Sequence, residues 1–127
     1  EEQSMPESRM DKMIEMNIRN DLYGSMLTIR QREIINLYYE ENFSLSEIAE
    51  EFSISRQAVH DTLKKAEKAL AVYERKLGLV EKFKKSEKAV RSIDKIIEKL
   101  VKEHSEDKKL TSQLEKIKQE IYRIDKQ

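Results

Sequence analysis

The sequence predicts an all-α protein that combines a helix-turn-helix bundle with a C-terminal helical hairpin or coiled-coil extension. Charged residues make up 39% of the 127 positions and hydrophobic residues 38%, and only two glycines occur. This composition is typical of helical chains and leaves little room for a turn-rich β protein. The single proline, Pro6, precedes the first periodic segment, so no later position forbids a helix interior.

Two helices are expected before the central motif. The first reaches about Ser25, because apolar residues recur before it at helical spacing. They are Met10, Met13, Ile14, Ile18 and Leu22. Thr28 precedes a second periodic segment and is expected to cap that helix at its N-terminus. The second helix should end near residues 40–42, where two glutamates and an asparagine follow one another.

Residues 44–63 have the apolar spacing of two short helices joined by a tight turn, which is typical of a helix-turn-helix. The inner positions of this motif are Ile48, Ala49, Phe52, Ile54, Val59 and Leu63. Ser44 and Glu47 form a capping box at the first helix, and Ser55 is expected to begin the second in a similar way. Ser53 occupies the turn position that usually needs a positive φ, which serine tolerates at a modest cost.

The helical pattern that begins at Ser55 continues to Leu77, where Gly78 is suited to be a left-handed terminating residue. We therefore expect one domain over residues 1–78 and a helical hairpin over residues 79–127, with a break at residues 105–107. The hairpin should mediate a homodimer, because a lone pair of helices buries too little apolar surface. The expected interface comprises Val90, Ile93, Ile97, Leu100, Leu114, Ile117 and Ile121. The same heptad spacing would serve packing within one chain equally well.

Basic and acidic residues are distributed unevenly, although the net charge is zero. Residues 1–54 contain 5 basic and 12 acidic side chains, residues 55–79 contain 6 and 3, and the remainder contains 14 and 10. A globally basic surface for nucleic acid is therefore missing. Binding would depend on a local patch that begins at Arg56 and is doubled by dimerisation.

The candidate nucleic-acid-binding residues are Ser55, Arg56, Gln57, His60 and Lys64. They belong to the second helix of the motif, which usually enters a nucleic-acid groove. Arginine and glutamine can pair with base edges, lysine neutralises phosphate, and a helix N-terminus can contact phosphate. The alternative is an ordinary solvated helix face. The acidic residues nearby favour that alternative or a basic protein partner; they are Glu47, Glu50, Glu51 and Asp61.

No residue pattern indicates an enzyme, a cofactor or a metal site. Cysteine is absent, and the two histidines, His60 and His104, lie far apart without a partner at ligand spacing. The sequence has neither a glycine-rich phosphate loop nor a glycine-flanked serine. Its apolar runs are far shorter than the roughly 20 residues of a membrane span. We expect a soluble, cytoplasmic protein without a signal peptide and without membrane insertion.

Several segments resemble known helix-turn-helix families. LTIRQ at residues 27–31 and SLSEIAE at residues 44–50 are similar to region 4 of bacterial sigma factors. A closer resemblance, to the YlxM family, covers roughly residues 10–85. It depends on LYGSMLT at residues 22–28, LYY at residues 37–39, FSISRQAVHD at residues 52–61 and YERKL at residues 73–77.

The YlxM resemblance implies a small helix-turn-helix protein encoded beside the signal recognition particle (SRP) GTPase genes of Gram-positive bacteria. It implies an accessory or regulatory role in SRP protein targeting, with the SRP RNA or the SRP GTPase as partner. The alternative function is a sigma-like, DNA-binding transcriptional regulator unrelated to SRP. Under either function, the expected protein is a non-enzymatic regulator that binds nucleic acid, either DNA or RNA.

Overall fold

The structure, a computed structural model, describes residues 6–125, with side chains described for residues 8–124. Every regular element in this part of the chain is helical, which confirms the expected all-α class. The elements are α1 (Pro6–Tyr23), η1 (Gly24–Met26), α2 (Ile29–Ile35), η2 (Asn36–Glu40), α3 (Leu45–Phe52), α4 (Arg56–Leu77), α5 (Leu79–Glu103) and α6 (Lys108–Asp125). None of the helices in the described residues is both long and apolar enough to cross a membrane.

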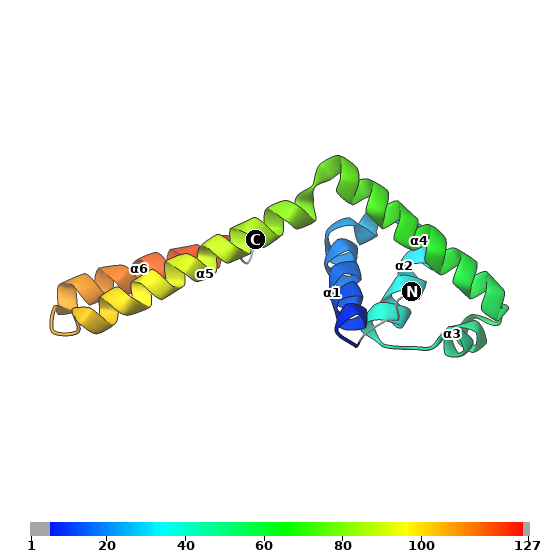
Figure 1. The fold of residues 1–127 in the computed structure, drawn as a ribbon, viewed down its shortest axis with the longest axis horizontal. Helices are drawn as coiled ribbons and strands as arrows, with labels where there is room; N and C mark the ends of the chain where they lie inside the picture. Colours follow the sequence, from blue (N-terminus) through cyan, green and yellow to red (C-terminus); the bar gives the residue numbers. More distant parts are fainter. Residues whose placement is uncertain (1–5, 126–127) are drawn as a thin grey trace. The chain divides into compact units, whose positions relative to one another are not determined.

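The chain divides into two compact units, Glu1–Val80 and Glu81–Gln127. In the first unit, α4 is the longest helix, and α1, α2 and α3 pack against it (Figure 1). The core includes Ile48, Ala49, Val59 and Leu63, while Phe52 and Ile54 are partly buried against it. These six positions are the predicted inner face of the helix-turn-helix, so that prediction is confirmed.

Side chains cap three helices of the first unit, as the sequence predicted. Thr28 and Gln31 form a reciprocal capping box at α2. Ser44 and Glu47 do the same at α3, with bonds of 3.1 and 2.8 Å. The Ser55 hydroxyl accepts a bond from the third amide of α4 at 3.0 Å. These bonds satisfy amides that have no partner inside their own helix.

Left-handed residues end two of these helices. Ser53 has a φ of 55° after α3, and Gly78 has a φ of 63° after α4, as the sequence predicted. The second predicted helix differs in detail, because α2 ends at Ile35 and the chain continues through the π-helical segment η2. A π turn holds an extra residue, and Tyr39 lies buried within it.

The second unit is a helical hairpin in which α5, from residue 81 onward, and α6 run antiparallel (Figure 1). A turn that follows Glu103 joins them. Within the described residues, side-chain interactions link the two helices. Tyr122 Oη donates a hydrogen bond to Asp94 Oδ2 at 2.9 Å, and Lys118 Nζ lies 3.6 Å from Glu98 Oε2.

The seven residues of the expected dimer interface occupy different environments in this hairpin. Ile97 and Leu114 are buried within the chain itself. Val90, Leu100 and Ile121 are half-buried, whereas Ile93 and Ile117 remain exposed. Part of the apolar seam is thus used inside one chain, and dimerisation stays a prediction.

Candidate nucleic-acid interface

The predicted binding residues lie together at the start of α4. Arg56 is exposed and forms no ion pair within residues 8–124. Ser55 is exposed too, but its hydroxyl is occupied as the cap of α4. Gln57 Nε2 donates a hydrogen bond to Asp61 Oδ1 at 2.9 Å. Arg56 can therefore contact a ligand without breaking a bond, whereas Gln57 must first release Asp61.

His60 and Lys64 each lie beside an acidic residue. His60 Nδ1 is 3.7 Å from Asp61 Oδ1, and this nitrogen has no hydrogen-bond partner in the described structure. Lys64 Nζ is 3.5 Å from Glu67 Oε1. The Lys64 side chain is 54% exposed and its ammonium has three donors, so it can contact a phosphate while it stays beside Glu67.

Two of the three acidic residues of α4 face the protein core. Tyr39 Oη donates a hydrogen bond to Glu67 Oε2, and the Glu67 side chain is only 11% exposed. Tyr23 Oη donates to Glu74 Oε1 at 2.6 Å, and the same oxygen accepts the Val80 N–H at 2.9 Å. Burial and then these hydrogen bonds raise the pKa of both tyrosines, so each remains a protonated donor at neutral pH.

The direction of these glutamates leaves α4 with a basic solvent-facing surface. Its exposed cations are Arg56, Lys64, Lys65, Lys68, Arg75 and Lys76. Lys64, Lys68 and Arg75 share a face of α4, because Lys68 follows Lys64 by four residues and Arg75 follows Lys68 by seven. Of these three, only Lys64 was predicted from the sequence, although helical spacing places Lys68 and Arg75 on the same face. Asp61 is the acidic residue of α4 that remains exposed on this side.

Acidic residues of α3 lie next to the start of α4. Glu47 and Glu50 line a shallow pocket of about 330 Å³ together with Arg56. Glu51 is also exposed and forms no ion pair within the described residues. A polyanion that approaches Arg56 therefore meets carboxylates, whereas Lys68 lies about three helical turns further along α4.

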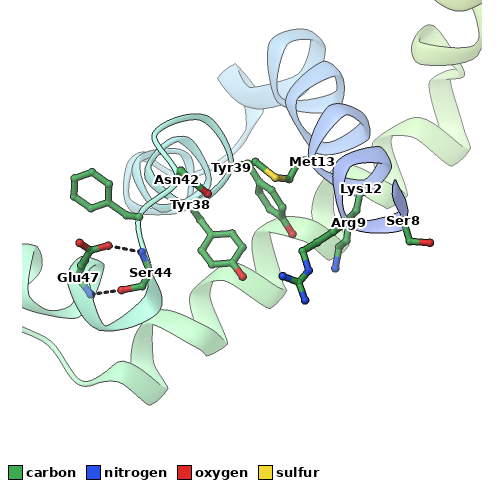
Figure 2. A pocket seen from close by; sticks show the side chains of 10 residues that line it. Ser8, Arg9, Lys12, Met13, Tyr38, Tyr39, Asn42, Ser44 and Glu47 are labelled. Carbon is green, nitrogen blue, oxygen red and sulfur yellow. Dashed lines mark hydrogen bonds between the residues drawn. The ribbon is translucent and has the colours of Figure 1, made fainter. Parts of the chain in front are cut away.

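A larger cleft of about 740 Å³ lies between α1 and the segment that joins η2 to α3. Figure 2 shows Arg9 and Lys12 of α1 on one side, the Ser44–Glu47 capping pair on the other, and Tyr38 between them. This cleft was not predictable from the sequence, because segments about 30 residues apart in sequence form it. Its α1 side suits an anion, whereas Glu47 opposes one on the far side.

Potential metal ligands do not gather within the described part of the chain, where no group of three histidine, cysteine, aspartate or glutamate side chains could hold an ion. His60 belongs to the first compact unit and His104 to the second. Apart from the exposed Asp61, α4 presents positive charge and hydrogen-bond donors to solvent.

The chain is similar to known proteins over most of its length. Residues 10–121 match the model of the family UPF0122, described as "Putative helix-turn-helix protein, YlxM / p13 like". A UPF0122 protein of Desulforamulus reducens is 54% identical over 81 residues, covering 64% of this chain and 69% of the relative. Another, from Halalkalibacterium halodurans, is 46% identical over 90 residues, covering 71% and 83%.

A third UPF0122 protein, from Listeria innocua, is 38% identical over 108 residues, which cover 85% of this chain and 96% of the relative. The match therefore extends beyond the helix-turn-helix into the hairpin. It confirms the YlxM resemblance of the sequence motifs. The chain belongs to the UPF0122 family of YlxM/p13-like helix-turn-helix proteins.

Proposed function

We propose that this protein is a non-enzymatic regulatory protein that binds nucleic acid through α4. The observation behind the proposal is the direction of Glu67 and Glu74, which face the core and leave lysines and arginines on the solvent side of the helix. The second helix of a helix-turn-helix usually enters a nucleic-acid groove. The family and the charge of α4 thus support the same role.

Each candidate residue has a distinct role in the proposed contact. Arg56 is suited to bidentate contact with a guanine edge or a phosphate. Gln57 is suited to an adenine edge once it releases its acceptor within α4. Lys64 neutralises phosphate, and His60 adds charge only when it is protonated. Ser55 holds the first turn of α4 in place through its cap, so that the free amides there can meet a phosphate.

Binding of the full chain to labelled duplex DNA and to RNA, measured over a range of salt concentrations, tests this proposal. Arg56→Ala/Lys64→Ala should reduce the slope of log K against log salt by up to about 1.8 for duplex DNA, because each phosphate contact contributes roughly 0.9. The matched control, Lys108→Ala/Lys109→Ala, removes two exposed lysines of α6 and should retain more of the slope. If the wild type binds neither nucleic acid at low salt, the proposal is wrong.

We further propose that the protein acts in SRP protein targeting, as an accessory or regulatory component that contacts the SRP RNA or the SRP GTPase. The YlxM resemblance supports this proposal. Retention of the protein by the reconstituted particle, or a change in the particle's GTP hydrolysis, is the expected result. Absence of both results would overturn the SRP role and leave nucleic-acid binding by α4 as a separate question.

The alternative is a sigma-like, DNA-binding transcriptional regulator unrelated to SRP. The similarity of residues 27–31 and 44–50 to sigma region 4 supports it. Specific retardation of genomic DNA fragments, without retention by the reconstituted particle, would select this alternative. Equal retardation of all fragments would argue against it, because a transcriptional regulator must distinguish its site from other DNA.

We also propose that the second unit mediates a homodimer. Ile93 and Ile117 of the expected interface are 40% and 49% exposed, and Ile96 and Ile124 are 57% and 74% exposed. Helical spacing puts these residues beside the stripe that is buried inside the hairpin. A two-helix layer with such a face is usually covered by a further layer, which a second copy of the hairpin would supply.

Light scattering of full-length variants tests the homodimer. Ile93→Lys/Ile117→Lys should yield a monomer, because it places two charges in the apolar face. The control, Ser92→Lys/Ser112→Lys, adds the same charge at exposed polar positions of the same helices and should stay dimeric. A monomeric wild type, or an isoleucine variant with unchanged dimer mass, contradicts the proposal.

A further inference from the structure

One side of α5 presents an uninterrupted row of cations. Its members are Lys84, Lys88, Arg91, Lys95, Lys99 and Lys102, and all are exposed. Successive members are three or four residues apart, so they lie on one face of the helix. At 1.5 Å per residue, the row is about 27 Å long.

The acidic residues within the same stretch are each engaged by another side chain. Asp94 accepts a hydrogen bond from Tyr122 of α6, and Glu98 pairs with Lys118 of α6 at 3.6 Å. Glu87 Oε1 lies 3.4 Å from the arginine of the row. Two of the three acids are thus held by α6, and Glu87 is the one that pairs with a member of the row itself.

A row of this kind opposes the stability of its own helix. Opposite charges four residues apart stabilise a surface helix, whereas like charges at three or four residues destabilise it. The row on α5 contains five successive like-charge neighbours, and Glu87 offsets part of their repulsion through its ion pair with Arg91. A polyanion bound along the row would relieve the repulsion that remains, whereas salt only screens it.

We propose that the row on α5 binds the phosphate backbone of a nucleic acid as a second contact surface of the same chain. The inference rests on the proposed function for the class of partner and adds a surface to it. Duplex DNA presents one negative charge per about 1.7 Å of its axis, so its repeating charge matches a long row of cations. Because one chain contains α4 and α5, contact through either surface raises the effective concentration of the other.

The test uses the full chain and a labelled random-sequence duplex longer than the row. Lys88→Gln/Lys95→Gln/Lys99→Gln removes three members of the row and should lower the slope of log K against log salt by about 2.7. At 0.1 M salt, this change in slope corresponds to about 500-fold weaker binding. The matched control is Lys108→Gln/Lys109→Gln/Lys116→Gln, which removes three exposed lysines from α6 of the same hairpin. It should retain most of the wild-type slope.

A second variant separates charge from side-chain identity. Replacing the same three lysines of α5 by arginine preserves the row and should retain wild-type binding. Circular dichroism should show wild-type helix content for all three variants, because lysine, arginine and glutamine have similar helix propensity. Binding lost equally by the arginine variant would show that positive charge is not the basis of the contact, and would overturn the inference.

The remaining outcomes distinguish this inference from the proposed function. An unchanged slope in the α5 glutamine variant, or an equal loss in the α6 control, overturns the second surface. The α4 proposal then still stands if Arg56→Ala/Lys64→Ala weakens binding. Conversely, a loss confined to the α5 variant supports the second surface and contradicts docking by α4. Wild-type chain that binds phosphatidylserine vesicles but no nucleic acid overturns the choice of partner.

Discussion

Replacing Tyr23 by phenylalanine removes one hydroxyl from the place where α4 ends and α5 begins. The Tyr23 ring is fully buried, and its hydroxyl makes two hydrogen bonds. It donates to Glu74 Oε1 at 2.6 Å and accepts the Leu79 N–H at 2.9 Å. Leu79 is the first residue of α5, and its amide has no partner within that helix. The substitution leaves this amide and the Glu74 carboxylate short of a partner.

The cost of Tyr23→Phe follows from these two bonds. A hydrogen bond to a charged group contributes about 1.5–3 kcal/mol and a neutral one about 0.5–1.5 kcal/mol. Glu74 retains its bond from the Val80 N–H, so we expect a total loss of about 2–4 kcal/mol in the free energy of unfolding. For a unit of this size, such a loss lowers Tm by roughly 10–25 °C.

Urea unfolding followed by tyrosine fluorescence measures this change, because four of the five tyrosines belong to the first unit and tryptophan is absent. The matched control is Tyr73→Phe. Its hydroxyl donates to the Met26 carbonyl at 3.3 Å in an exposed position, so we expect a loss of about 0.5 kcal/mol. Equal unfolding midpoints for the two variants would refute the assigned role of Tyr23. Faster hydrogen exchange at the Leu79 amide in Tyr23→Phe would support it independently.

Three further predictions concern the first unit. Ser53→Gly should raise the free energy of unfolding by about 1 kcal/mol, because a φ of 55° strains serine but not glycine; a lower urea midpoint would contradict this. Gly24→Ala should destabilise by about 1–3 kcal/mol, because a Cβ there would overlap Asn20 Oδ1; an unchanged Tm would contradict it. The folded-state pKa of Tyr23 and Tyr39 is raised. Their stabilisation is therefore complete below about pH 10 and declines at higher pH as the unfolded chain ionises. When the pH rises from 8 to above 10, the urea midpoint should therefore fall less for Tyr23→Phe than for the wild type, because the variant lacks one of these two tyrosines.

The bounds of the helices were largely predictable because they depend on bonds between neighbouring residues. Ser44 and Glu47 cap α3 across three residues, and the sequence shows that spacing directly. Ser53 and Gly78 end their helices because of their own backbone conformation. The π-helical segment η2 was not predictable, since its extra residue reflects the packing of Tyr39 rather than a local signal.

The candidate site was predictable only in part. Helical spacing placed Arg56 and Lys64 on the start of the second motif helix, where the structure has them exposed. It did not indicate that Gln57 bonds to an acid within α4, because several rotamers were open to both side chains. In the hairpin, heptad spacing gave one seam for each helix. The structure divides the apolar residues between a buried side and an exposed side.

The sequence by itself determined the helical class, the order of the helices, their caps and the inner face of the helix-turn-helix. These features follow from composition, periodicity and contacts between close neighbours. Only the tertiary structure decided which charges face solvent. Glu67 and Glu74 face the core because they accept hydrogen bonds from tyrosines 28 and 51 residues away. A chain of zero net charge thereby acquires a basic surface on α4, because packing brings those distant donors to the two glutamates.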